Sequence, residues 1–81
     1  MKTANIIVIF QESDYSILYN LVSESVFDTF NKKPEEEKLS YIMQLTESEE
    51  NKIIFESIPD LFKYVCENDV TLLSSYETIL Y

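Results

Sequence analysis

Carboxylates are the most abundant reactive side chains in this sequence. The chain has 15 Asp and Glu residues against six Lys, with no Arg and no His, so its formal net charge is −9 over 81 residues. Paired carboxylates can act as general acid and base or hold Mg²⁺, but among so many acidic residues some near pairs arise by chance. We therefore single out no metal site, and we expect no metal and no cofactor.

Nucleophilic catalysis finds little support in the same composition. A Ser, Thr or Cys nucleophile needs a base beside it, and without histidine that base would have to be a carboxylate or a lysine. Cys66 is the only cysteine, which excludes an intramolecular disulfide and a Cys/His zinc cluster. The chain has no glycine, so it lacks phosphate-binding glycine loops. We expect a protein that is not an enzyme.

The negative charge favours a basic protein partner over nucleic acid. Binding to a phosphate backbone gains most of its free energy when Lys and Arg release condensed counterions, and we expect no direct nucleic-acid binding here. A small acidic protein can instead occupy the basic groove of a nucleic-acid enzyme in place of DNA. The alternative is a surface that is only highly soluble, because net charge alone governs solubility and association rates.

One tripeptide, Glu56-Ser57-Ile58, joins an acidic, a hydroxyl and an apolar side chain where a predicted strand meets a predicted helix. Its simplest interpretation is helix capping. Ser57 would accept amide protons, Glu56 would favour the positive end of the helix, and Ile58 would pack as a staple into the core. Glu-Ser occurs four times in the chain, and only here is it followed by Ile.

At this tripeptide the chain resembles the uracil-DNA glycosylase inhibitors carried by phages and mobile elements of Gram-positive bacteria. In that family a Glu-Ser-Ile segment at a strand edge, followed by a helix with acidic residues and an aliphatic stripe, enters the enzyme's DNA-binding groove. The resemblance implies that Glu56 and Ser57 stand in for DNA phosphate oxygens. It also implies that Ile58 packs at the contact and that Asp60 supplies an acidic group one turn into the helix.

Members of that family also form an apolar pocket between helix and sheet, which captures the leucine that the glycosylase inserts into the DNA minor groove. From the predicted faces, we expect Met43, Ile54, Leu61 and Val65 to line such a pocket. The resemblance thus implies a stoichiometric 1:1 inhibitor of uracil-DNA glycosylase, acting as a DNA mimic in the cytoplasm of a bacterial host.

Two alternatives stay open. A second register, Gln11-Glu12-Ser13, also ends a predicted strand and matches the Gln-Glu-Ser of one branch of the family, but has Asp14 where isoleucine is wanted. The target also has an alternative: a restriction enzyme, a CRISPR effector or a nucleoid protein. Against those, Glu35–Glu37 and Glu47–Glu50 could serve as phosphate surrogates without a leucine pocket.

The elements that position these residues follow from apolar patterning. Residues 5–10 read Asn-Ile-Ile-Val-Ile-Phe, an apolar and mostly β-branched run after Asn5, which predicts a central strand. From Asp14 to Phe30, apolar residues recur at three- and four-residue steps, which predicts one long helix blocked by Pro34. Alternation over residues 39–45 predicts a strand, paired as a hairpin with a strand over residues 52–56.

The last third of the chain predicts a helix that opens at Ser57 and ends at Asn68-Asp69, then an extended segment from Val70 to Tyr81. The sum is one α+β domain over residues 1–81, with two helices packed on one face of a four-stranded, mostly antiparallel sheet, in βαββαβ order. The apolar run Ile6–Phe10 is too short for a signal peptide or a membrane span, so we expect a cytoplasmic protein away from membranes.

Overall fold

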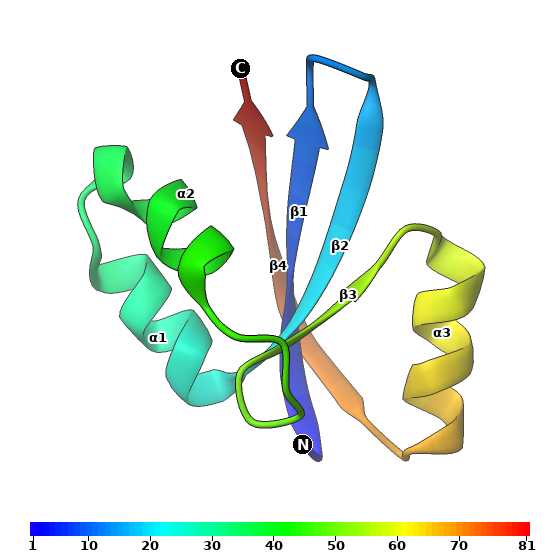
Figure 1. The fold of residues 1–81 in the computed structure, drawn as a ribbon. Helices are drawn as coiled ribbons and strands as arrows, with labels where there is room; N and C mark the ends of the chain where they lie inside the picture. The colour runs from blue at the N-terminus through cyan, green and yellow to red at the C-terminus, as the bar shows by residue number, and fades with distance from the viewer.

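The computed structural model describes all 81 residues, and the α+β class is confirmed. Its elements are β1 (Thr3–Gln11), β2 (Ser16–Ser23), α1 (Glu24–Lys32), α2 (Glu35–Gln44), β3 (Lys52–Phe55), α3 (Ile58–Glu67) and β4 (Thr71–Leu80). The four strands form one sheet in the order β3-β2-β1-β4 (Figure 1). The β1–β2 and β2–β3 pairs are antiparallel and the β1–β4 pair is parallel, so the sheet is mixed and mostly antiparallel.

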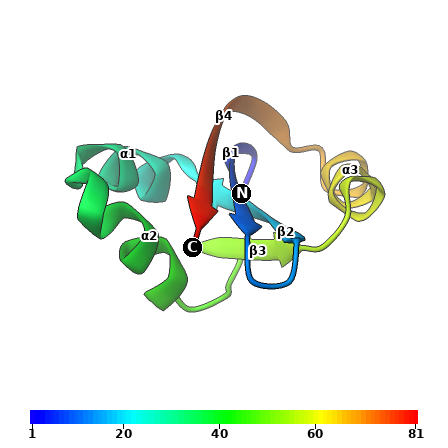
Figure 2. The same cartoon turned by 90° about the horizontal axis from the view of Figure 1, so that it is seen from above.

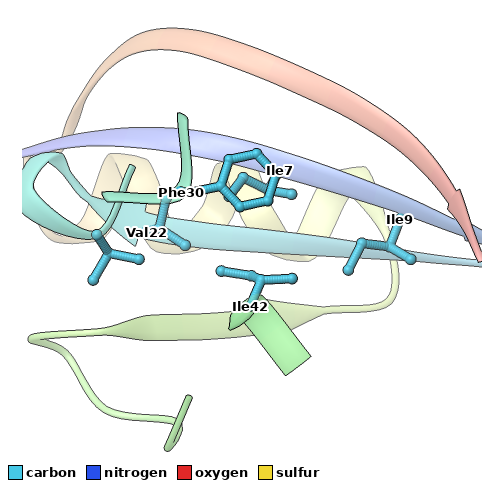
Figure 3. Packing of buried hydrophobic residues seen from close by; sticks show 6 residues of the cluster. Ile7, Ile9, Val22, Phe30 and Ile42 are labelled. Atoms are coloured by element: carbon cyan, nitrogen blue, oxygen red, sulfur yellow. The ribbon is translucent and has the colours of Figure 1, made fainter. Parts of the chain in front are cut away.

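Helices cover both faces of this sheet, whereas two helices on a single face were predicted. α1 and α2 lie on one side and α3 lies on the other (Figure 2). Ile7 and Ile9 of β1 pack with Phe30 and Ile42 on the α1/α2 side (Figure 3). A second cluster, with Leu61 of α3 at its centre, lies on the opposite face. The central strands are therefore apolar on both faces, as the sequence of β1 predicts.

The predicted helix from Asp14 to Phe30 is wrong in its first half, which forms β2. Leu18 packs in the α1/α2 cluster while Leu21 packs in the α3 cluster, so the apolar residues of β2 alternate between two cores. Over so short a run, that alternation also fits helical spacing. The helix begins only at α1, where the Ser23 hydroxyl accepts a 3.3 Å hydrogen bond from the Val26 amide as N-cap.

The predicted strand over residues 39–45 is also wrong, because this segment belongs to α2. Ile42 is fully buried and Leu39 and Leu45 pack beside it, a three-residue spacing that turns one helix face to the core. Three glutamates, Glu35–Glu37, occupy the first turn, where the helix dipole favours negative charge. The predicted hairpin does not form, and β3 pairs with β2 instead.

The predicted βαββαβ order is therefore wrong, since the elements follow in the order ββααβαβ, but the bounds predicted for the remaining elements are confirmed. β1 and β3 lie within a residue or two of the predicted bounds, and α3 opens with Ser57 as N-cap and ends at Asn68. Asp69 then adopts a left-handed conformation (φ 52°), which turns the chain into β4. None of the helices is long and apolar enough to cross a membrane.

Candidate partner-binding groove

The two Glu-Ser segments that the sequence left as alternatives lie at the same end of the sheet. Gln11 pairs with Ser16 at the turn between β1 and β2, and β3 stops at Phe55, opposite Tyr19 of β2. Glu56 follows directly. A hollow of about 370 Å³ opens between the two segments, and we call it the acidic hollow. Its lining residues are Gln11, Asp14, Ser16, Ile17, Leu18 and Glu56.

A hydrogen-bonded turn fixes one wall of the acidic hollow. The Ser16 hydroxyl lies 2.6 Å from both Asp14 Oδ1 and Gln11 Oε1, and the Ser16 amide donates to Asp14 Oδ1 at 3.0 Å. The side-chain hydrogen bond from Ser16, followed by the backbone one, lowers the pKa of the Asp14 carboxyl below its usual value. This turn leaves Glu12 and Ser13 exposed at the tip.

In the Glu56-Ser57-Ile58 segment, Ser57 has a structural role, whereas Glu56 and Ile58 are exposed to solvent. The Ser57 hydroxyl accepts a 3.3 Å hydrogen bond from the Asp60 amide, so Ser57 caps α3 as the simplest interpretation predicts. The predicted staple is wrong, because Ile58 is 47% exposed. Glu56 and Asp60 are exposed too. Their side chains and that of Ile58 are therefore accessible to a partner.

An apolar pocket adjoins the acidic hollow on the α2 side of the sheet. Its volume is about 110 Å³, and it shares Gln11 and Leu18 with the hollow. Its lining residues are Ile9, Gln11, Leu18, Asn20, Met43, Lys52 and Ile54. Pocket and hollow lie next to each other on either side of the shared residues Gln11 and Leu18. We call the two together the partner-binding groove.

The structure brings together only two of the four predicted pocket residues. Met43 of α2 and Ile54 of β3 line the apolar pocket. Leu61 is buried in the α3 cluster with Val65 packed against it, on the other face of the sheet. The four-residue pocket is therefore wrong. Because residues 35–44 form a helix, it is α2, and not the helix after Glu-Ser-Ile, that provides the pocket wall.

Two buried polar residues of the pocket gave no signal in the sequence. Lys52 is 4% exposed, and its Nζ donates a 2.6 Å hydrogen bond to the Ile42 carbonyl. Desolvation by burial lowers the pKa of the Lys52 ammonium, and the charge of Glu47 partly opposes this. The Asn20 amide donates to the Ile7 carbonyl at 3.2 Å. Since both side chains bond to main-chain carbonyls, the pocket presents mainly its apolar side chains.

The surface carries little cationic charge to neutralise its carboxylates. All fifteen carboxylate residues are exposed. A single ion pair joins Lys38 to Glu35 at 4.0 Å, which leaves fourteen of the fifteen without a lysine partner. Lys38 is itself buried, and its Nζ donates to the carbonyls of Phe30, Asn31 and Lys33 at 3.1, 3.0 and 2.7 Å. With Lys52 also buried, two of the six lysines cap helix ends and are withdrawn from the surface.

The groove thus offers anionic oxygens beside a small apolar cavity. No group of three or more acidic side chains is placed to hold a metal ion. Comparisons of this chain with protein-family models, with curated proteins and with solved structures find no match. A proposal for the function of this protein therefore rests on the residues of the groove.

Proposed function

We propose that this protein is an acidic DNA mimic that inhibits uracil-DNA glycosylase by occupying the enzyme's basic DNA-binding groove. The observation that carries the proposal is the partner-binding groove. In it, Glu56 and the Gln11–Asp14 turn border one hollow, and an apolar pocket opens beside that hollow. This arrangement is complementary to a DNA-binding cleft that carries basic side chains and also inserts an apolar side chain into DNA.

The unpaired carboxylates supply long-range attraction. Exposed charges of one sign raise the rate of encounter with an oppositely charged cleft, and this gain falls with ionic strength. With one ion pair among fifteen carboxylates, little of the negative potential is cancelled locally. Glu56 and Asp14 at the rim of the hollow then take the place of DNA phosphates in contacts with the enzyme's basic groups.

The apolar pocket supplies the anchor that a tight complex needs. Rim charges mainly change association rates, whereas a desolvated apolar side chain seated in a pocket slows dissociation. A volume of about 110 Å³ suits one aliphatic side chain. The leucine that the glycosylase inserts into DNA has this size and chemistry, and it would contact Met43 and Ile54, which both line the pocket.

The test is a uracil-excision assay with purified glycosylase and a uracil-containing duplex. We expect inhibition that is complete near one equivalent of this protein and is overcome by excess DNA. Uracil release that is unchanged at a large excess of the protein rules out this target. Addition of an unrelated acidic protein of similar charge controls for non-specific screening of the enzyme.

A different DNA-binding target is the second candidate, and the carboxylates outside the groove favour it. Glu35–Glu37 in the first turn of α2 and Glu47–Glu50 before β3 are exposed and do not line the hollow. A mimic that uses these two stretches would need no apolar pocket. This candidate is tested by competition with DNA for binding to a restriction enzyme, a CRISPR effector or a nucleoid protein. It predicts that the same protein preparation displaces the DNA and leaves uracil excision unchanged.

A further inference from the structure

A second apolar surface lies on the face of the sheet opposite the apolar pocket. Phe10 of β1 is paired with Ile17 of β2 on one side and with Ile79 of β4 on the other. Their chain neighbours Ile9, Leu18 and Leu80 all pack in the α1/α2 cluster. Because successive side chains of a strand point to opposite faces, these three residues form a row on the α3 side. We call Ile17, Phe10 and Ile79 the cross-strand row.

No helix of this chain covers the cross-strand row. The ends of β1, β2 and β4 extend beyond α3, which packs near the other end of the sheet (Figure 1). The three residues belong to neither hydrophobic cluster. Ile17 and Ile79 are 37% and 44% exposed, and the Tyr15 ring, 6.4 Å from that of Phe10, is exposed as well. Contiguous exposed apolar side chains of this kind mark interaction sites.

The charges around the row decide what covers it. Glu77 lies two residues before Ile79 on the same face of β4, and Glu12 and Asp14 stand in the turn that joins Phe10 to Ile17. No lysine occurs between Lys2 and Lys32 or after Lys63, so the strand ends around the row carry acidic residues only. A second copy, also with a net charge of −9, would bring carboxylates against carboxylates. A basic partner would not.

We propose that the cross-strand row binds a basic amphipathic helix of a partner protein. Neighbouring strands are about 4.8 Å apart, so the row from Ile17 to Ile79 is roughly 10 Å long. Residues i and i+7 of a helix are separated by about 10.5 Å along its axis. A helix with apolar residues at i, i+3 or i+4, and i+7 therefore matches the row, while flanking Lys or Arg side chains reach Glu77, Glu12 and Asp14. This surface shares Ile17 and Asp14 with the acidic hollow but none of its residues with the apolar pocket. It can exist whether or not the glycosylase is the target.

The probe is a synthetic Leu/Lys amphipathic helical peptide of about 18 residues, titrated into the ¹⁵N-labelled full chain. We expect shift changes concentrated at residues 8–10, 15–19 and 77–80, and none from a peptide with Glu in place of Lys. The variant Ile17→Thr/Ile79→Thr keeps β-branched side chains at exposed positions, so the fold is retained. It should bind about tenfold more weakly, because apolar contact is lost at both ends of the row.

The matched control is Leu73→Thr, which removes an exposed leucine of β4 outside the row and should leave the affinity unchanged. Equal binding by the double variant and the natural chain would overturn the proposal. Shift changes centred on Met43 and Ile54, or equal binding of the acidic peptide, would do the same. Sedimentation provides a second measurement. A concentration-dependent dimer that Ile17→Thr/Ile79→Thr abolishes would show that a second copy covers the row, against the proposal.

Discussion

Lys52 Nζ donates a 2.6 Å hydrogen bond to the carbonyl oxygen of Ile42, in the last turn of α2. Carbonyls in the last turn of a helix lack partners within the helix, and the dipole favours a cation there. α2 has no basic residue of its own in that turn. The buried ammonium at the start of β3 therefore fixes the end of α2 against the sheet, and with it the separation of Met43 from Ile54 across the apolar pocket.

Replacing this ammonium should destabilise the fold. Lys52→Met keeps the length of the side chain but removes the charged hydrogen bond, which costs about 1.5–3 kcal/mol in the free energy of unfolding. Urea denaturation followed by circular dichroism measures the change. Lys63→Met, at an exposed position of α3, is the matched control and should stay within about 0.5 kcal/mol. Equal stability of the two variants would contradict the capping role of Lys52.

Filling the apolar pocket should weaken inhibition without preventing folding. Ile54→Phe places a larger side chain against Met43 and closes the space for an incoming leucine. Loss of an anchor of this kind costs about 2 kcal/mol, or roughly thirtyfold in Kd, measured by surface plasmon resonance with the glycosylase. Val65→Phe is the control on the opposite face. If both folded variants bind equally well, the pocket is not the anchor.

The charge of Glu56 should act on the association rate. Glu56→Gln removes one carboxylate from the rim of the acidic hollow, and we expect slower association with a smaller change in dissociation. Glu67→Gln removes another exposed charge at the far end of α3 and should have less effect. The association rate should fall for every variant as the salt concentration rises from about 0.05 M to 0.5 M. A salt-independent rate would argue against electrostatic steering.

Ser57 should prove to be a cap. Ser57→Ala removes the acceptor for the Asp60 amide and should cost about 1 kcal/mol of stability. Ser57→Asp retains a capping oxygen and should restore thermal stability. Titration calorimetry with the glycosylase then separates the two roles. Full binding by Ser57→Asp identifies the hydroxyl as structural, whereas a large loss in this stable variant would show that Ser57 contacts the partner directly.

Alkaline pH should weaken the contact between β4 and α2. The Tyr76 hydroxyl donates to Glu35 Oε2 at 3.2 Å. Desolvation, followed by the Glu35 charge, raises the pKa of the Tyr76 phenol. A raised pKa in the folded state means that this contribution is fully present below about pH 10 and is lost as pH rises through the folded value.

Two other groups with shifted pKa values contribute to the stability in this range. The pKa of Tyr64 is also raised, while that of Lys52 is lowered and works in the opposite direction. The informative quantity is therefore a difference between variants. Tyr76→Phe should lose less stability than the natural chain between about pH 9 and 11, and Tyr81→Phe, at the exposed C-terminus, should lose as much as the natural chain. Parallel curves for Tyr76→Phe and the natural chain would contradict the prediction.

Local sequence patterns were sufficient to predict an element where its apolar spacing or its capping residues fit only one kind of secondary structure. The β-branched run of residues 5–10 could only be buried on both faces, and it forms β1. Ser57, Pro59 and the Leu61–Val65 stripe specified α3 down to its N-cap. Patterns failed for β2 and α2, because burial there depends on which element lies opposite. Leu18 and Leu21 contact different cores, and Ile42 faces the sheet from a helix.

The sequence by itself determined the net charge, the absence of histidine and glycine, and the positions of the four Glu-Ser dipeptides. These properties belong to single residues and need no partner. Only the tertiary structure decided that Gln11 and Glu56 border one hollow, that Met43 and Ile54 line one pocket, and that Lys38 and Lys52 are buried. The physical reason is the strand order. Pairing β3 with β2, and β2 with β1, brings residues distant in the chain to one end of the sheet.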